Sequence, residues 1–92
     1  MYLEIVSPEA TLFSGEVTSV TVPGINGEFQ MLNNHAPIVS LLQAGDVKVD
    51  GDVSIDEEHE NKFSKDDKGR TVLAISSGTV EMKDNKVIVL AD

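Results

Sequence analysis

Apolar residues along the chain recur mainly at every second position, rather than at the 3.6-residue spacing of a helix. The segments "YLEI" (2–5) and "SVTV" (19–22) show this alternation most clearly. Phe13 and Val17 follow the opposite phase to the second segment, so a strand break or a β-bulge is expected between Gly15 and Thr18. No long helix is predicted, and the pattern indicates an all-β antiparallel sandwich or barrel.

The segment "TVEMKDNKVIVLA" (79–91) predicts a hairpin with a two-residue turn at Asp84 and Asn85. This turn places Met82 opposite Val87 on one face, and it also sets two lysines opposite each other, a small unfavourable contact. The segments 71–76 and 87–91 are apolar on both faces, so both are expected to be interior strands buried on both sides.

A second hairpin is predicted in "DVKVDGDVSI" (46–55). A three-residue loop at 50–52 sets Val49 opposite Val53, whereas a two-residue turn would set it opposite Asp52. Cross-strand partners share a face, so the longer loop is preferred. Residues 50–70 hold eight of the sixteen acidic residues and four of the seven basic ones. This composition predicts a long solvated hairpin with a mobile tip at 56–68.

The chain has 92 residues and a formal net charge of −9, with no cysteine. Its length suits one domain spanning residues 1–92. The acidic balance argues against nucleic acid and against direct binding or insertion into an anionic lipid surface, where a basic patch is needed. No apolar run approaches the length of a membrane-spanning helix, and the beginning of the chain lacks an export signal, so a soluble chain is expected.

Three candidate chemical sites find little support. The run "DEEHE" (56–60) has metal-ligating side chains but no rigid frame around them. A Ser–His–acid triad can be sketched from one of two serines with His35 and Glu28, yet no nucleophile elbow accompanies it; the serines are Ser7 and Ser40. The glycines of "PGING" (23–27) precede neither a helix nor a lysine, so a phosphate-binding loop is not indicated. No catalytic residue, metal or cofactor is predicted.

The segment "NNHAP" (33–37) predicts a turn that leads into a strand at 38–42. His35 has two interpretations. It is either a half-buried residue whose ring hydrogen-bonds the backbone of its own turn, or it lies with Glu28 at one end of the sandwich and contacts another protein.

Four segments together resemble the N-terminal β-sandwich domain of the epsilon subunit of the F-type ATP synthase: "VSPEATLFSG" (6–15), "VTVPGINGEF" (20–29), "HAP" (35–37) and "SSGTVEMKDNKVIVLAD" (76–92). The resemblance implies an all-β antiparallel β-sandwich of about ten short strands in one domain. Departures are Gln30 in place of a common glycine, Asn33–Asn34 in place of Pro-Gly, and the lengthened segment 50–70. Family members continue into two regulatory helices, whereas this sequence stops at Asp92, so the inhibitory and ATP-sensing roles of those helices are not carried over.

The resemblance further implies a non-catalytic rotor subunit of the central stalk, on the cytoplasmic side of a bacterial inner membrane. Its partners would be the gamma subunit, the c-subunit ring and the rest of the complex, and it would couple ion flow to rotation and ATP synthesis. The ring contact is expected at Glu28, Gln30, Asn34 and His35, and the gamma contact around Leu41 and Leu42. The alternative is a free-standing acidic sandwich that binds a ligand or carbohydrate. Its four aromatic residues, mostly at core-like positions, do not favour that reading.

Overall fold

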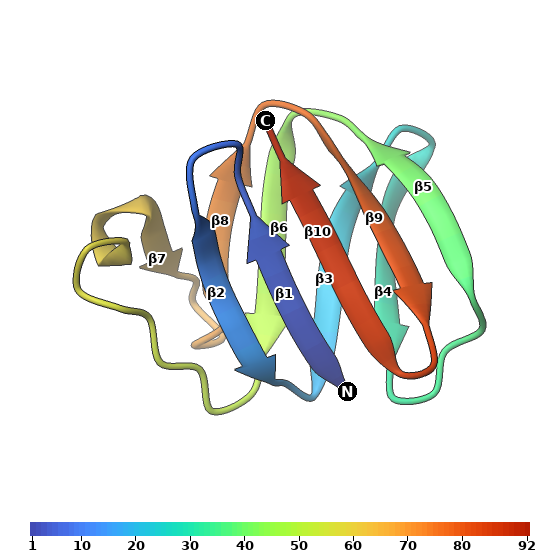
Figure 1. Ribbon diagram of the computed structural model, residues 1–92, viewed down its shortest axis with the longest axis horizontal. Helices are drawn as coiled ribbons and strands as arrows, with labels where there is room; N and C mark the ends of the chain where they lie inside the picture. The colour runs from blue at the N-terminus through green and yellow to red at the C-terminus, as the bar shows by residue number, and fades with distance from the viewer.

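The computed structural model describes residues 1–92 and contains ten strands and one short 3-10 helix (Figure 1). The strands are β1 (Tyr2–Val6), β2 (Thr11–Glu16), β3 (Ser19–Gly24), β4 (Gly27–Leu32), β5 (Ile38–Leu42), β6 (Gly45–Asp50), β7 (Phe63–Lys65), β8 (Thr71–Ile75), β9 (Gly78–Lys83) and β10 (Lys86–Ala91), and the helix η1 spans Glu60–Lys62. The all-β class and the ten short strands predicted from the sequence are confirmed. The protein contains no helix with the length and apolar character needed to cross a membrane.

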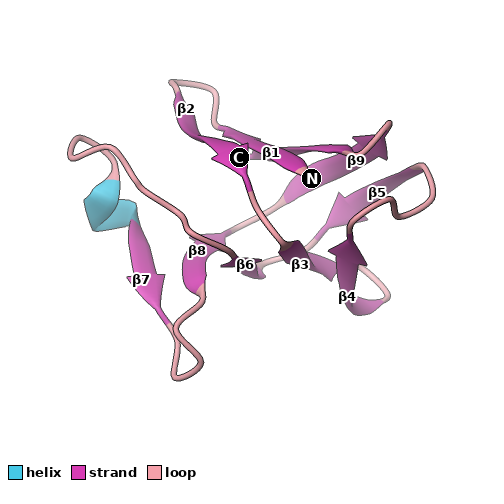
Figure 2. Cartoon of the chain, turned by 90° about the horizontal axis from the view of Figure 1, so that it is seen from below, coloured by secondary structure: helices cyan, strands magenta, loops and turns pink.

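The strands form one curled sheet in the order β2-β1-β10-β9-β5-β3-β6-β8-β7, with β4 paired to β3. Figure 2 shows the two facing layers, with β2, β1 and β9 in one and β3, β6 and β8 in the other. Strand β5 pairs with β9 along its length and reaches β3 through Leu42 opposite Gly24, which joins the layers at one edge. The expected antiparallel arrangement holds for every pair except β1 and β10, which run parallel.

The core lies between the layers and consists of 19 buried apolar residues. Strands β1 and β10 contribute alternate residues to it, as the period of two predicted; among these, Leu3, Ile5, Val87 and Val89 are fully buried. Such interlocked packing makes a two-layer β body stiff.

Two local predictions are confirmed. The phase change after Phe13 is a strand break, because β2 ends at Glu16 and β3 begins at Ser19. A separate register shift occurs between Ile5 and Val6 on β1. The turn at Asp84 and Asn85 has φ angles of 52° and 60°, which match the twist of a two-residue hairpin, and it sets Met82 opposite Val87 and Lys83 opposite Lys86.

The hairpin predicted at 46–55 is wrong. Strand β6 pairs with β3 on one edge, through Val49 opposite Val20, and with β8 on the other, through Val49 opposite Thr71. Both edges of β6 are therefore occupied, and the segment containing Val53 and Ile55 has no free edge to join. These two side chains instead pack partly buried against the core from a loop.

The prediction of two buried faces holds for one strand and fails for the other. In β8, all residues except Ala74 are buried. Strand β10 is interior in the sheet, but its outer face is open: Ile88 is half-buried and Leu90 is exposed. An interior position along the sheet hides the backbone edges of a strand, but it covers a side-chain face only where another layer packs over it.

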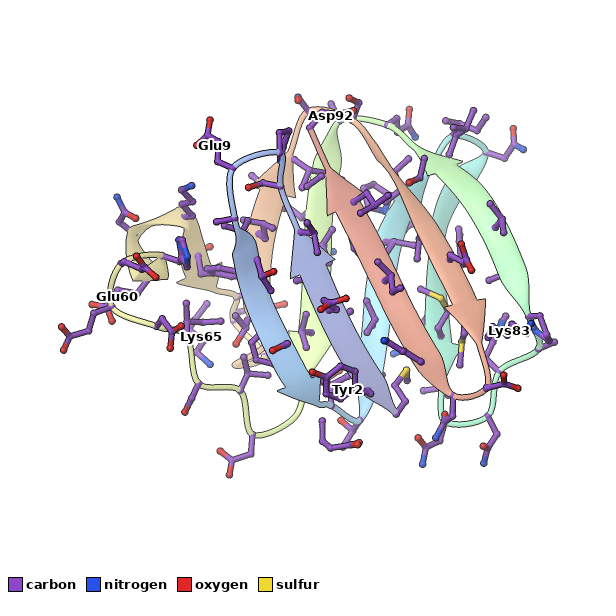
Figure 3. All side chains as sticks on the ribbon, viewed as in Figure 1. Tyr2, Glu9, Glu60, Lys65, Lys83 and Asp92 are labelled. Atoms are coloured by element: carbon purple, nitrogen blue, oxygen red, sulfur yellow. The ribbon has the colours of Figure 1, made fainter.

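The segment 50–70 is not a single hairpin. It contains η1 and the short strand β7, and β7 pairs with β8 through Phe63 opposite Leu73. Figure 1 shows β7 as the outermost strand of its layer, and Figure 3 shows the charged side chains of Glu60 and Lys65 on this segment. The true hairpin is therefore β7–β8, and its turn lies at 66–70.

Candidate protein-contact surfaces

The polar candidates of the sequence begin on β4, which pairs only with β3 and so has a free edge. Glu28 and Gln30 are exposed, whereas Phe29 is half-buried and Met31 is fully buried between them. The turn before β4 is tight: a Cβ on Gly24 would lie 2.8 Å from the carbonyl oxygen of Gly27 and from the Phe29 ring. Gly24 therefore sets the position at which β4 starts and at which Glu28 is presented.

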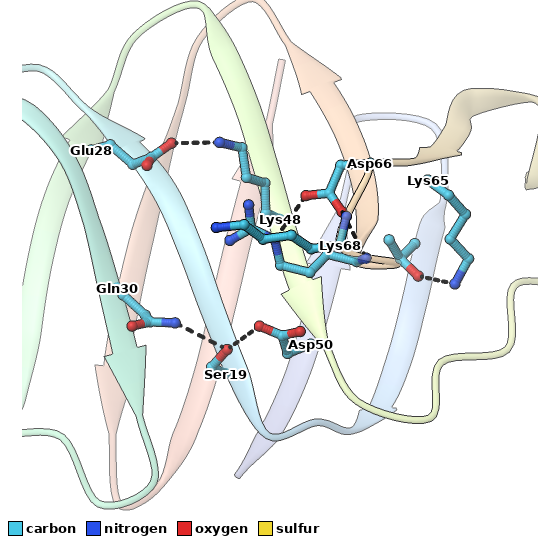
Figure 4. Close-up of polar contacts among 10 residues, drawn as sticks. Ser19, Glu28, Gln30, Lys48, Asp50, Lys65, Asp66 and Lys68 are labelled. Carbon is cyan, nitrogen blue, oxygen red and sulfur yellow. Dashed lines mark hydrogen bonds and ion pairs between the residues drawn. The ribbon is translucent and has the colours of Figure 1, made fainter.

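Glu28 accepts a hydrogen bond from Lys48 on β6, with Nζ and Oε2 3.0 Å apart (Figure 4). The Glu28 side chain is 53% exposed, and its other carboxylate oxygen makes no bond within the chain. An exposed ion pair of this kind contributes about 0–1 kcal/mol. The pair therefore orients Glu28 without removing it from solvent.

Next to this pair, Gln30 Nε2 donates to Ser19 Oγ at 3.3 Å, and Ser19 Oγ donates to Asp50 Oδ2 at 3.0 Å (Figure 4). These bonds cross from β4 through β3 to β6. They explain why every residue of β3 is buried although its outer face has no second layer above it.

Arg70 reaches the same face from the end of the segment 50–70. Its Nε donates to Asp66 Oδ2 at 2.7 Å, while Asp66 Oδ1 accepts the backbone N–H groups of Arg70 at 2.8 Å and Lys68 at 3.0 Å. Burial raises the pKa of Asp66, but the hydrogen bonds from Arg70 and Lys68 outweigh it and leave that pKa below its ordinary value. The same hydrogen bond to Asp66 raises the pKa of Arg70. Nothing in the sequence pattern indicated that Arg70 would lie beside β4.

Asn34 and His35 lie in the turn after β4. Asn34 has a φ of 61°, and its backbone N–H donates to Asn85 Oδ1 at 2.8 Å, which ties this turn to the β9–β10 turn. His35 is half-buried, and its Nδ1 donates to the Ala36 carbonyl oxygen at 2.8 Å. The interpretation of His35 as bonded to its own turn is thus confirmed.

The expectation that Glu28 and His35 share one end of the sandwich is wrong. Glu28 stands opposite Pro23 at the start of β4, while Leu32, opposite Ser19, ends the strand before the turn. At ~3.3 Å per residue, the six steps from Glu28 to Asn34 span about 20 Å. The four predicted ring-contact residues therefore follow the length of β4 and the turn after it, rather than one tip.

The two leucines predicted to contact gamma have opposite environments. Leu41 is 59% exposed on the outer face of β5, whereas Leu42 is 4% exposed and belongs to the core. Leu41 stands opposite Thr79 on β9, which in turn stands opposite Leu90 on β10. Leu41, Leu90 (49% exposed) and Val39 (76% exposed) thus line one outer face, here called the β5–β10 apolar face.

Polar residues bound this apolar face towards the β9–β10 turn. Lys86 and Lys83 are exposed there, and Lys86 Nζ lies 5.7 Å from the centre of the Tyr2 ring, labelled in Figure 3. On the other side, the backbone N–H of Ile25 donates to the Leu41 carbonyl oxygen at 3.3 Å, so the β3–β4 turn adds a further exposed apolar side chain.

The residues of the three chemical candidates do not converge. Ser7 Oγ bonds the backbone of Ala10, and Ser40 Oγ donates to the Leu41 carbonyl oxygen, so each serine is engaged locally, as His35 is. No three His, Asp or Glu side chains gather anywhere in the structure, the segment 56–60 included. Of the aromatic residues, Phe13 is buried in the core, and Phe29 and Phe63 pack half-buried against it, which leaves no flat exposed platform for stacking a sugar.

The fold and these two surfaces define a stiff β-sandwich domain with a polar edge strand and an apolar outer face, both open to protein contact. The chain belongs to the family described as ATP synthase, Delta/Epsilon chain, beta-sandwich domain, whose model matches residues 1–92. It is 39% identical over 92 residues to the ATP synthase epsilon chain of Campylobacter concisus, and 37% identical over 90 residues to that of Chlorobium limicola.

The chain spans 60% of the Campylobacter protein and 86% of the Chlorobium protein, and these alignments include 100% and 98% of its own residues. Among solved structures, the fold matches a chain of the central stalk and c ring of the Tetrahymena thermophila mitochondrial ATP synthase. That match has a TM-score of 0.73 and 14% identity, and covers 99% of this chain and 62% of the other. A chain of the Euglena gracilis mitochondrial ATP synthase matches with a TM-score of 0.72 and 20% identity, covering 97% and 48%. At this identity the two likenesses establish the fold alone.

Proposed function

We propose that this domain is a non-catalytic part of the rotor in the central stalk of an F-type ATP synthase. The match of the family to all 92 residues carries this proposal. The physical role is mechanical: a close-packed two-layer body deforms little under load and can pass torque between two partners. The chemistry of ATP synthesis is then left to other subunits, and the domain contributes no catalytic residue.

The β5–β10 apolar face is the proposed contact with the gamma subunit. Val39, Leu41 and Leu90 are among the most exposed large apolar side chains of the protein, and contiguous exposed apolar surface marks interaction sites. Leu42 supports this face only from beneath, because its side chain is in the core.

The edge of β4 and the turn after it are the proposed contact with the c-subunit ring. The free oxygen of Glu28 can accept a charge-assisted hydrogen bond from a basic residue of a ring loop, while Gln30, Asn34 and His35 add neutral hydrogen bonds. Each exposed contact contributes about 0.2–1 kcal/mol. Because these residues extend along a strand of about 20 Å, several contacts must act together. Such a position places the domain at the cytoplasmic surface of a bacterial inner membrane, within the whole complex.

Co-purification of the full-length subunit with gamma tests the proposal. We expect a monodisperse complex, and we expect Leu41→Asp to abolish it without unfolding the subunit. Leu32→Asp is the matched control, since Leu32 is 56% exposed on β4 in the other layer. Lack of association at micromolar concentration, or equal loss in both variants, contradicts the proposal.

A further inference from the structure

A small notch opens on the outer face of β3 and β4, beside the proposed ring contact. Its volume is about 220 Å³, and it is lined by Thr21, Glu28, Phe29, Gln30 and Arg70. Four of these residues come from β3 and β4. Arg70 comes from the lengthened segment 50–70, which delivers it through the Asp66 turn. The notch therefore depends on the part of the sequence that departs most from the family pattern.

The Thr21 hydroxyl is an unmet hydrogen-bonding group in this notch. Thr21 is 5% exposed, and its Oγ1 has no hydrogen-bond partner. Its neighbours in register are Gln30 on β4 and Lys48 on β6, but Gln30 bonds Ser19 and Lys48 bonds Glu28. Leaving a buried hydroxyl unpaired costs about 1–3 kcal/mol. A ligand that pairs with this hydroxyl recovers that cost.

The charges of the lining decide which ligand fits. Arg70 uses only Nε within the chain, so its terminal amino groups are available as donors, and Glu28 uses only Oε2, so Oε1 is available as an acceptor. An anion in the notch meets Glu28, and a cation meets Arg70. A neutral group with both a donor and an acceptor satisfies both walls, and an amide is such a group.

We propose that the notch binds a carboxamide or a backbone peptide group of the protein loop that lies along β4. The carbonyl oxygen accepts from the Arg70 guanidinium and the Thr21 hydroxyl, and the N–H donates to Glu28. The inference rests on the proposed function, in which that loop belongs to the c-subunit ring. It adds Arg70 and Thr21 to the contact residues and limits the bound group to a neutral one.

The first experiment tests the chemistry without the ring. The ¹⁵N-labelled full-length subunit is titrated with propionamide, propionate and propylammonium, three probes of similar size and different charge. We expect propionamide alone to shift the amide signals of Thr21, Gln30 and Arg70, and we expect Thr21→Val to reduce these shifts. Equal shifts with all three probes, or none with propionamide, overturn the proposal.

The second experiment measures binding of the full-length subunit to the purified c ring of the same organism. Thr21→Val keeps the shape and removes the hydroxyl, so we expect a higher Tm together with about 3–10-fold weaker ring binding. Thr11→Val, at an exposed position on β2, is the control and should change neither. A higher Tm with unchanged ring binding overturns the inference. If Glu28→Gln also leaves ring binding unchanged, the proposed ring contact fails, whereas the propionamide result is independent of it.

Discussion

Lys48 Nζ lies 3.0 Å from Glu28 Oε2, so a side chain of β6 reaches over β3 to hold a carboxylate on the edge strand β4 (Figure 4). The bond engages one oxygen and leaves the other facing solvent. The pair therefore restricts the rotamers of Glu28 before any partner arrives, which lowers the entropy that a partner must overcome. It also ties the free edge of the sheet to an interior strand.

Glu28→Lys should loosen coupling to the ring and leave the fold intact. The substitution places two ammonium groups side by side, but at an exposed site this costs no more than about 1 kcal/mol. We expect nearly unchanged thermal melts and reduced ATP-driven ion pumping in reconstituted enzyme. Glu57→Lys makes the same charge change on an exposed loop and should leave pumping normal. A large fall in Tm for Glu28→Lys would show that the residue is structural.

The neighbours Leu41 and Leu42 should separate binding from stability. Leu42→Ala removes a buried side chain, so we expect the free energy of unfolding to fall by about 2–5 kcal/mol. Leu41→Ser changes an exposed residue and should alter it by less than about 0.5 kcal/mol while weakening gamma binding. Chemical denaturation and a gamma binding assay measure the two effects. The reverse pattern would contradict the assignment of the β5–β10 apolar face.

Local patterns predicted the parts of the fold that depend on nearest neighbours. The Asp84–Asn85 turn and the pairing of Met82 with Val87 follow from turn chemistry and alternation, and both are present. The wrong hairpin at 46–55 had the same kind of support. It failed because β3 and β8 occupy both edges of β6, and competition between strands distant in sequence leaves no local signal. The parallel pairing of β1 with β10 is equally nonlocal.

The candidate sites show the same limit. The resemblance identified Glu28 and His35 as contact residues, but the β4 register sets them at opposite ends of one strand. Leu41 and Leu42 are adjacent in the chain, and only the phase of β5 decides which one faces solvent. Arg70 carried no signal at all, since its position depends on how the Asp66 turn folds back onto β3 and β4.

The contact between the Asn34 backbone and the Asn85 side chain should stabilise two turns at once. Asn85→Gly keeps the positive φ of 60° and removes the acceptor of a 2.8 Å hydrogen bond, so we expect a loss of about 0.5–1.5 kcal/mol. Asn85→Ala should lose about 1–2 kcal/mol more, because a Cβ disfavours the left-handed conformation. Urea unfolding measures both, with Asn61→Ala on η1 as an exposed control. Equal losses for glycine and alanine would mean that backbone conformation is unimportant here.

The Asp66–Arg70 pair should make stability depend on acid pH. The pKa of Asp66 is lowered in the folded state, so the unfolded chain takes up a proton first as pH falls. The contribution of Asp66 is therefore complete above its ordinary pKa of 3.8 and is lost as pH falls through the lower folded value. We expect Asp66→Asn to reduce Tm at pH 6–8 and the difference from the unsubstituted protein to shrink below about pH 4. Asp67→Asn, at the exposed neighbouring position, should show no such convergence. A difference that stays constant from pH 7 to pH 2 would show that the side-chain shape of Asp66, rather than its charge, holds the turn and the position of Arg70.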